Sequence, residues 1–306
     1  MDICDAFCGV GGFSSGAMAA GCTVILGIDS DKVPLQHWAA NTKGAAIRAT
    51  IGSDEIDWPD ARPDLHVHLS PPCTNLSKAR AGRMTECEKN DALSMLRWCI
   101  DLVLRKKYDS WSLETVSTPE TVRVFEELAL AHRECVAFSV VDAADYGSPQ
   151  NRLRIIASTP SVIQNLEQVP VCRISVSDAF EANGVILQSQ YFRSNTKKRN
   201  GSACVRSVHE QSFTVTASHP LTWTDRAGYT NRCFTVAESA CLMGFQKDWI
   251  LPPGSRKGQK AVGNSVPVQL SRAIMQAAID ARNSKLVSRN INKLNEHAHL
   301  HMHDGR

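Results

Sequence analysis

The sequence predicts an α/β fold built on an open, mostly parallel sheet. Three observations indicate this class. An apolar strand at residues 2–7 leads into a glycine-rich turn and a helix, a second strand at 22–28 ends in acidic residues, and a third at 65–69 stops at two prolines. In open α/β sheets, ligands bind at the carboxyl ends of the strands. We therefore expect the chemistry at the ends of these three strands.

The composition is that of an ordinary globular enzyme. Of the 306 residues, 43% are hydrophobic and 21% are charged, which suits one large domain or two unequal ones. No apolar run approaches the length of a membrane span, and no basic segment followed by an apolar core marks a secretory signal. We therefore expect an intracellular protein, in the cytoplasm or nucleoid, with no membrane partner. The net charge of +3 neither requires nor excludes nucleic acid.

The cysteines favour a reducing compartment. There are eleven, an odd number, scattered without regular spacing, which argues against a disulfide framework. Cys4 and Cys8 are followed by no second Cys/His pair at ligand spacing, so no metal site is predicted. The polar tail from Lys285 is expected to be disordered, and its alternating histidines are given little weight as metal ligands.

Three glycines follow the first strand, at Gly9, Gly11 and Gly12. They let the backbone turn tightly and approach a ligand. A helix from about residue 14 to residue 20 follows, with Gly21 as its stop, so polar ligand atoms would lie at the helix N-terminus. The dinucleotide motif G-x-G-x-x-G does not fit, because Ser14 stands at its third glycine, and no phosphate-loop lysine is present. A purely structural turn is an equal alternative.

The second strand ends in Asp29-Ser30-Asp31. An acidic residue that closes this strand typically binds ribose hydroxyls, so Asp29 is the ribose candidate. Asp31 is predicted to be the N-cap of the next helix, which has Pro34 in its first turn. A nucleoside cofactor without a pyrophosphate fits this pattern best, and S-adenosylmethionine meets that description.

The third strand presents a cysteine. Residues 65–69 alternate, with leucine and valine on one face and His66 and His68 on the other. Pro71 and Pro72 then remove two N–H donors and end the strand. Cys73 follows at the carboxyl end, where a thiol is a candidate nucleophile. The alternative is an inert buried cysteine at a strand end.

A glutamate closes the apolar strand at 111–113. Glu114 is either a catalytic carboxyl group or a solvated strand-end residue. The helix after it is predicted to have Thr118 as N-cap and Pro119 at its first position. Apolar stripes also predict helices at 88–105 and 268–282, which we assign to the core.

Two basic clusters are candidate nucleic-acid contacts. The first is a glycine-containing loop after Cys73, with Lys78, Arg80 and Arg83. The second lies in the polar segment 160–230 and comprises Arg193, Lys197, Lys198, Arg199 and Arg206. Ordinary solvated loops are the alternative for both. Trp223, in the same segment, is expected to be a core residue.

Taken together, six motifs resemble those of the cytosine-C5 DNA methyltransferase family, in the family's order. They are Asp5-Ala6-Phe7-Cys8-Gly9-Val10-Gly11-Gly12-Phe13, Pro71-Pro72-Cys73, Glu114-Thr115-Val116, Gln150-Asn151-Arg152-Leu153-Arg154, the block Arg232-Cys233-Phe234-Thr235 with Glu238 and Leu242-Met243-Gly244-Phe245, and Gly263-Asn264-Ser265-Val266. One such motif is a modest signal. Six in a fixed order, spanning residues 2 to about 275, make chance an unsatisfactory explanation.

The resemblance implies a Rossmann-like S-adenosylmethionine methyltransferase sheet with a smaller target-recognition domain. The catalytic and cofactor domain would comprise residues 1–158 and 259–284, and the recognition domain residues 159–258. Residues 285–306 would form the disordered tail. The recognition segment is short, which suggests a brief target sequence.

The resemblance also assigns roles to residues. Phe7 would stack on the adenine of the cofactor, the glycine loop would lie beside its methionine part, and Asp29 would hold its ribose. Cofactor binding would be completed from the far end of the chain by Asn264, Ser265 and Val266. The catalytic set would be Cys73 as nucleophile, Glu114 at N3 of the cytosine, and Arg154, with Arg152 nearby, at O2. Ser77 would belong to the loop that closes over DNA.

Several positions depart from the family pattern. Thr74 stands where glutamine is usual, and Thr115 where asparagine is usual. The aspartate expected at the adenine amino group is not evident around residues 49–51. His66 and His68 are unusual in a strand buried on both faces. None of these departures removes a catalytic group.

The sequence leaves three functions open. The first is a monomeric methyltransferase that acts on double-stranded DNA, alone or beside a separate cognate restriction endonuclease. The second is the same chemistry on tRNA. The third is a catalytically silent homologue that only binds DNA. The intact catalytic residues argue against this third function. The sequence does not identify the base that removes the C5 proton.

Overall fold

The structure is a computed structural model that describes residues 1–72, 76, 85–197 and 203–303, without the side chains of 195–197, 203, 289 and 291–303. Its larger sheet has seven strands in the order β3-β2-β1-β4-β5-β7-β6. The bounds are β1 Asp2–Ala6, β2 Thr23–Asp29, β3 Ala45–Arg48, β4 Leu65–Leu69, β5 Trp111–Val116, β6 Ala137–Asp142 and β7 Leu153–Ser158. All neighbours are parallel except β7, which runs antiparallel to β5 and β6. This confirms the predicted α/β fold class.

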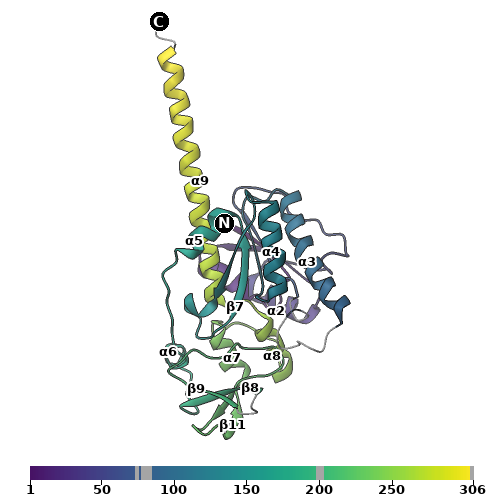
Figure 1. Ribbon diagram of the computed structural model, residues 1–306, viewed down its shortest axis with the longest axis vertical. Helices are drawn as coiled ribbons and strands as arrows, with labels where there is room; N and C mark the ends of the chain where they lie inside the picture. The colour runs from purple at the N-terminus through teal and green to yellow at the C-terminus, as the bar shows by residue number, and fades with distance from the viewer. Residues whose placement is uncertain (73–75, 77–84, 198–202, 304–306) are drawn as a thin grey trace.

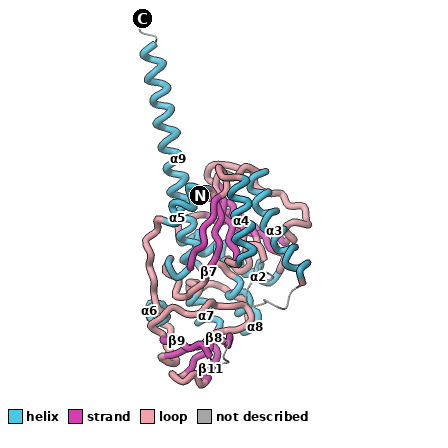
Figure 2. The backbone as a smooth tube through the Cα atoms, in the orientation of Figure 1, coloured by secondary structure: helices cyan, strands magenta, loops and turns pink. Residues whose placement is uncertain are grey.

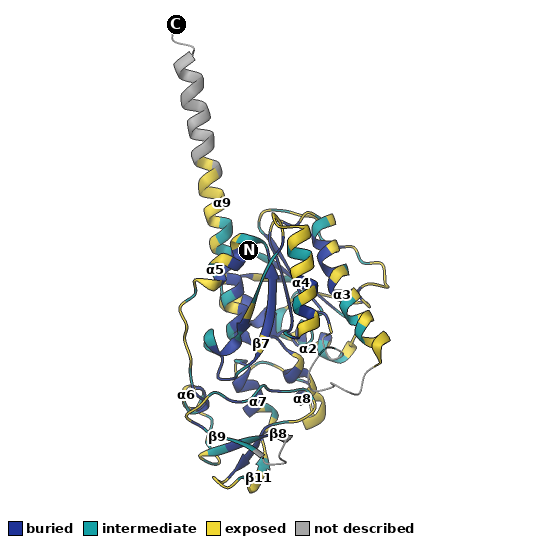
Figure 3. Ribbon diagram, in the orientation of Figure 1, coloured by how far each residue is buried: buried dark blue, intermediate teal, exposed yellow. Residues whose placement is uncertain are grey.

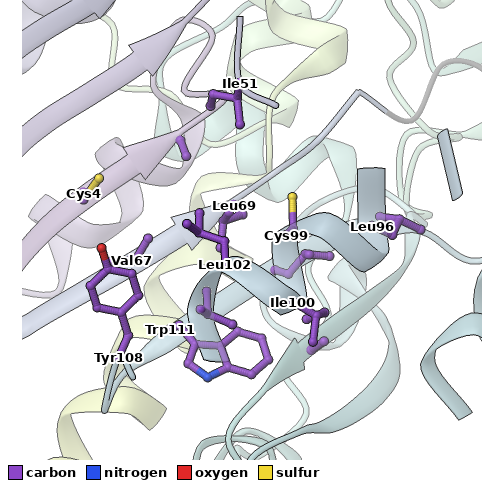
Figure 4. Packing of buried hydrophobic residues seen from close by; sticks show 14 of the residues in the cluster. Cys4, Ile51, Val67, Leu69, Leu96, Cys99, Ile100, Leu102, Tyr108 and Trp111 are labelled. Carbon is purple, nitrogen blue, oxygen red and sulfur yellow. The ribbon is translucent and has the colours of Figure 1, made fainter. Parts of the chain in front are cut away.

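Helices cover both faces of this sheet (Figures 1 and 2). On one face lie α3 Glu86–Arg105 and α4 Pro119–Ala131, which bury Ile100 and Phe125 among the apolar residues of β4 and β5. Figure 4 shows part of this cluster, with Cys99 of α3 near Leu69 of β4. The other face is covered by α1 Gly12–Ala19, α2 Lys32–Thr42, α5 Pro160–Glu167 and α9 Val268–His303.

Local signals fix the helix ends as the sequence predicts. Asp31 caps α2 by accepting a hydrogen bond from the Val33 amide at 3.2 Å. Thr118 caps α4, which has Pro119 at its first position. Gly21 takes φ 81°, the left-handed conformation expected of a glycine that ends a helix. The end of β5 differs from the prediction: the strand continues to Val116, so Glu114 lies within the strand and not at its end.

The second sheet is antiparallel, in the order β11-β10-β8-β9. Its strands are β8 Tyr191–Lys197, β9 Ala203–Ser207, β10 Thr222–Thr224 and β11 Thr230–Cys233, accompanied by α6 Val176–Ala182, α7 Val236–Leu242 and α8 Ser255–Asn264. Trp223 is fully buried here and stacks on Phe234 with 4.4 Å between ring centroids, which confirms it as a core residue. Figure 3 shows this second core as a separate buried region. A short 3₁₀ helix, Ala143–Asp145, follows β6.

Helix α9 is longer than predicted and projects away from the body of the molecule (Figure 1). Its first turns bury Leu270 and Ile274 against α1 and α5. It then continues to His303, where the sequence analysis expects a disordered tail. The reason is local: no glycine or proline interrupts residues 268–303. Within the part of the chain that the structure describes, no helix is long and apolar enough to cross a membrane.

Candidate active site

A cavity of about 490 Å³ opens at the carboxyl ends of the central strands. Its walls come from the ends of β1, β2, β4 and β5 and from α8. Among the residues predicted from sequence, it is lined by Phe7, Gly9, Gly12, Asp29, Glu114, Asn264, Ser265 and Val266, together with Pro71 and Pro72. The cavity therefore brings together motifs that are more than 250 positions apart in the chain.

The glycine loop is shaped by close packing. Phe7 takes φ 60° and Gly11 takes φ 90°, so the chain turns sharply as it leaves β1. A Cβ atom on Gly12 would lie 2.4 Å from the carbonyl oxygen of Val266 and 2.8 Å from Cβ of Ser265. Only glycine fits there. The loop and the Gly263–Val266 motif thus form one cradle, which supports the predicted return of the distant motif to the pocket.

The carboxylate of Asp29 organises the loop from the end of β2. It accepts hydrogen bonds from the backbone amides of Gly9 and Asp31, both at 2.8 Å. Burial raises the pKa of Asp29, and these two hydrogen bonds oppose the rise. The carboxylate also lines the cavity, where it can accept hydrogen bonds from the hydroxyl groups of a ligand.

A second carboxyl group lies beneath the loop and is fully buried. Asp5 accepts a hydrogen bond from the Ser14 hydroxyl at 2.5 Å, and that hydroxyl accepts one from the Trp38 indole at 2.8 Å. Burial raises the pKa of Asp5 to about 7. Because Ser14 belongs to the first turn of α1, this chain of contacts ties the helix after the loop to β1.

The two unusual histidines lie in the same polar layer. His66 pairs with the hydroxyls of Ser110 and Ser112, and His68 pairs with Ser112, each at 2.8 Å. Phe13 stacks on His68 with 3.4 Å between ring centroids. Burial lowers the pKa of both histidines, so both are neutral at neutral pH. Ser110, just before β5, Ser112 on β5 and the Phe13 ring on α1 therefore account for these departures from the family pattern.

Glu114 and Arg154 form a buried ion pair beside the cavity. Nε of Arg154 lies 2.7 Å from Oε1 of Glu114, and the two side chains are only 10% and 7% exposed. The pair arises because β5 and β7 are antiparallel neighbours, with Glu114 opposite Ile156 and Val116 opposite Arg154. Glu114 lines the pocket, and the ion pair brings the Arg154 guanidinium to it; the roles of both residues at a cytosine stay predictions.

Arg152 is engaged elsewhere. Its guanidinium donates to the carbonyl oxygens of Val215 at 2.9 Å, Gly263 at 3.1 Å and Ser265 at 3.0 Å. It therefore connects the start of β7 to the pocket motif and to the segment before β10. Three of its hydrogen bonds therefore go to backbone carbonyl groups, and its expected place near Arg154 at O2 of the cytosine stays a prediction.

Several predicted residues lie outside the described part of the chain. They are Cys73, Ser77, Lys78, Arg80, Arg83, Lys198 and Arg199; the backbone of Lys197 is in β8, but its side chain is not described. Pro72, which lines the cavity, is the residue directly before Cys73. In the second basic cluster, Arg206 donates to Asn151 at 2.7 Å and lies over the Phe213 ring, so it is part of the fold.

Several residues at or near the pocket were not predicted from the sequence. Lys257 and Lys260 of α8 line it one helical turn apart, and Lys260 lies 3.5 Å from Asp31. The indole of Trp249 donates to the Val10 carbonyl at 2.9 Å. The one available signal was the position of these residues between the Leu-Met-Gly-Phe and Gly-Asn-Ser-Val motifs.

Comparison with known proteins agrees with this geometry. A family model described as C-5 cytosine-specific DNA methylase matches residues 1–218 and 160–280. Together these matches cover most of the chain, so the protein belongs to the C-5 cytosine-specific DNA methylase family. The resemblance seen in the motifs is therefore confirmed. This family uses S-adenosylmethionine as its methyl donor, and the glycine cradle and the Asp29 carboxylate fit such a nucleoside.

Individual relatives match nearly end to end. Type II methyltransferase M.NgoBI of Neisseria gonorrhoeae is 26% identical over 312 residues, covering 92% of this chain and 95% of that protein. Type II methyltransferase M.NlaX of Neisseria lactamica is 26% identical over 327 residues, covering 93% and 99%. Among solved structures, the Dnmt2 methyltransferase of S. pombe has a TM-score of 0.59 at 15% identity, covering 90% of this chain and 98% of that chain. This last likeness concerns the fold.

Proposed function

We propose that the protein is a DNA (cytosine-5-)-methyltransferase that acts on a flipped-out cytosine in duplex DNA. The observation that carries this proposal is the buried pair of Glu114 and Arg154 beside a cavity large enough for a nucleoside. Pro72, which precedes Cys73 in the chain, lines the same cavity. A carboxyl group and a guanidinium can bind the N3 and O2 edge of a cytosine. A base enters such a pocket only after leaving the stack, which costs a few kcal/mol.

The chemistry follows from the weakness of C5 as a nucleophile. The Cys73 thiolate would add to C6, which makes C5 electron-rich, while Glu114 at N3 and Arg154 at O2 stabilise the charge that the ring gains. The bound cofactor supplies a methyl group on a sulfonium centre. Loss of the C5 proton to a base then re-forms the C5–C6 double bond, and Cys73 leaves as thiolate.

The remaining pocket residues would bind the cofactor. We assign adenine stacking to Phe7, ribose binding to Asp29, and the methionine part to the loop of Gly9, Gly11 and Gly12. Asn264, Ser265 and Val266 would complete the site. For Arg152 we propose a positioning role, because its three hydrogen bonds hold Gly263 and Ser265 at the pocket.

DNA would bind between the two sheets, over the cavity. We propose a catalytic domain of residues 1–158 and 259–284 and a target-recognition domain of 159–258. Lys78, Arg80 and Arg83 would contact phosphates beside the flipped base, with Ser77 in the closing loop, and Lys197, Lys198 and Arg199 would do so from the second sheet. A monomer that works beside a separate restriction endonuclease would suit the type II relatives.

The direct test is methyl transfer from tritiated S-adenosylmethionine to unmethylated genomic DNA, with bisulfite sequencing of the product. We expect methylation at C5 within one short sequence. Transfer to tRNA but not to DNA would show that the substrate is tRNA. The names of the relatives do not favour this alternative. Cofactor binding without any transfer would indicate a silent DNA-binding homologue.

A further inference from the structure

The glycine loop is anchored in the core of the second sheet. The side chain of Val10, between Gly9 and Gly11, is fully buried in the cluster that also contains Phe192, Trp223 and Phe245. A loop that binds cofactor atoms with its backbone thus has its side chain packed in a different part of the fold. Its conformation therefore depends on the second sheet as well as on β1.

Trp249 contacts the same loop from outside. Its indole N–H donates to the Val10 carbonyl at 2.9 Å. A Cβ on Gly11 would come within 3.0 Å of both the Trp249 and Trp38 rings, so the two indoles hold the loop between them. One of these indoles comes from α2, and the other comes from the segment that follows α7.

Asn41 fixes the residue next to Trp249. Its side-chain carbonyl accepts from the Ile250 amide at 2.8 Å, and its amide donates to the Ile250 carbonyl at 2.9 Å. These two bonds join positions 209 residues apart, at a site where the Ile250 side chain is 51% exposed. Pro252, two residues further on, lines the cavity.

We propose that Asn41, Trp249 and Ile250 form a clasp whose role is to hold the glycine loop in its cofactor-binding conformation. The inference rests on the proposed function, in which this loop binds S-adenosylmethionine. Asn41 and Trp249 are then positioning residues, since they act on the cofactor through the backbone of Val10 and Gly11. Without the clasp, the Gly9 amide that holds Asp29 is less well fixed, and the ribose site loosens.

The variants Trp249→Phe and Asn41→Ala test the clasp from its two sides. Phenylalanine keeps the ring and removes the N–H, and alanine removes both bonds to Ile250. Trp98→Phe is the matched control, because Trp98 packs against Trp58, away from the pocket. The readouts are S-adenosylhomocysteine affinity by calorimetry, the melting temperature, and kcat and KM for S-adenosylmethionine on unmethylated genomic DNA.

Each clasp variant should bind S-adenosylhomocysteine about three- to tenfold more weakly, the loss expected for one or two hydrogen bonds. KM for S-adenosylmethionine should rise by the same factor, with kcat within about twofold of wild type. The double variant should lose less than the product of the two single losses, because both act on one clasp. Trp98→Phe should bind as wild type does.

Unchanged S-adenosylhomocysteine affinity in both clasp variants, or a fall in kcat with KM unchanged, would contradict the proposed role of the clasp. If Trp249→Phe does not fold, the result for Asn41→Ala decides the matter. Failure of the wild type itself to bind S-adenosylhomocysteine would overturn the proposed function, and the clasp's role with it. Binding by the wild type without methyl transfer would leave the affinity comparison intact and count against the proposed function alone.

Discussion

At the scale of single residues, we expect the buried pair of Glu114 and Arg154 to contribute both to the rate of methyl transfer and to the stability of the fold. Removing one partner of a buried ion pair leaves the other charge without compensation. Arg154→Leu should therefore lower the free energy of unfolding by about 3 kcal/mol and the rate of methyl transfer by about 100-fold or more. Urea unfolding and initial rates measure both effects.

The half-exposed pair of Arg97 and Glu127, at 2.6 Å, is the matched control for the Glu114–Arg154 pair at 2.7 Å. Arg97→Leu should cost less than about 1 kcal/mol and leave the rate unchanged. Glu114→Gln, which keeps the shape of the side chain, should lose activity with less destabilisation. Normal turnover in Arg154→Leu would exclude the proposed contact at O2.

The burial of Asp5 predicts a pH dependence of stability. Its folded-state pKa of about 7 lies above the ordinary value of 3.8, so the folded protein holds a proton that the unfolded chain has lost. This group favours folding below pH 4, and that contribution is lost as the pH rises to about 7, by up to about 1.4 kcal/mol per pH unit. Asp5→Asn removes the effect and can still accept the Ser14 hydrogen bond.

We therefore expect the free energy of unfolding of Asp5→Asn, relative to wild type, to increase from pH 4 to pH 7. Measuring the difference between the two proteins at each pH removes the opposite contribution of His66 and His68, whose lowered pKa values weaken folding in acid. A difference that stays constant over this range would contradict a buried, protonatable Asp5.

At the scale of elements, α9 divides into a packed half and an exposed half. Leu270, Ile274 and Ala277 are buried, whereas residues 283–288 are exposed. A chain that stops after Ser288 should melt within about 2 °C of the full chain, because it keeps every residue of α9 that the structure records as buried. Thermal unfolding followed by circular dichroism measures this. A much larger loss would show that the end of α9 packs on the molecule.

The elements also show what sequence patterns can and cannot predict. Capping residues such as Asp31 and Thr118 act locally, so their helix starts are predictable from a few neighbours. The end of α9 was missed because polar composition says little about a helix that nothing interrupts. The position of Glu114 within β5 depends on its pairing with β7, and pairing between distant strands leaves no local trace in the sequence.

At the site, too, local motifs were predictable from the sequence and contacts between distant parts of the chain were not. Phe7, Asp29 and the glycines lie in recognisable motifs at strand ends, so the pocket that the structure shows was predictable. Trp249 bonds to the loop across 239 residues, and Asn41 bonds to Ile250 across 209 residues. No pattern near Trp249 or Asn41 in the sequence indicates these contacts. Arg152 was assigned with Arg154 because the two share a motif, although its three backbone partners lie far along the chain.

At the scale of the whole molecule, binding to DNA should depend steeply on salt. Three phosphate contacts from Lys78, Arg80 and Arg83 would give a slope of log K against log salt near −2.7, or about a 40-fold loss of affinity between 50 and 200 mM. Replacing all three with glutamine should flatten the measured slope by about that amount. Filter binding or fluorescence anisotropy over a salt series measures it.

Lys285→Gln is the control, because Lys285 pairs with Asp109 at the opposite end of the sheet, at 2.6 Å. Its slope should equal that of the wild type. An unchanged slope in the triple variant would exclude this loop as a phosphate contact.

The measurement that tests the central claim most directly is a search for the covalent intermediate. Genomic DNA amplified with 5-fluorocytosine in place of cytosine is long enough to contain any short target sequence. Fluorine at C5 leaves no proton for a base to remove after methyl transfer, so the covalent intermediate cannot break down. Wild-type protein with S-adenosylmethionine should therefore remain attached to this DNA after denaturation, with the linked peptide containing Cys73. The Cys73→Ser variant should form no such complex. An adduct that persists in Cys73→Ser, or no adduct from a wild type that methylates ordinary DNA, would contradict the proposed mechanism.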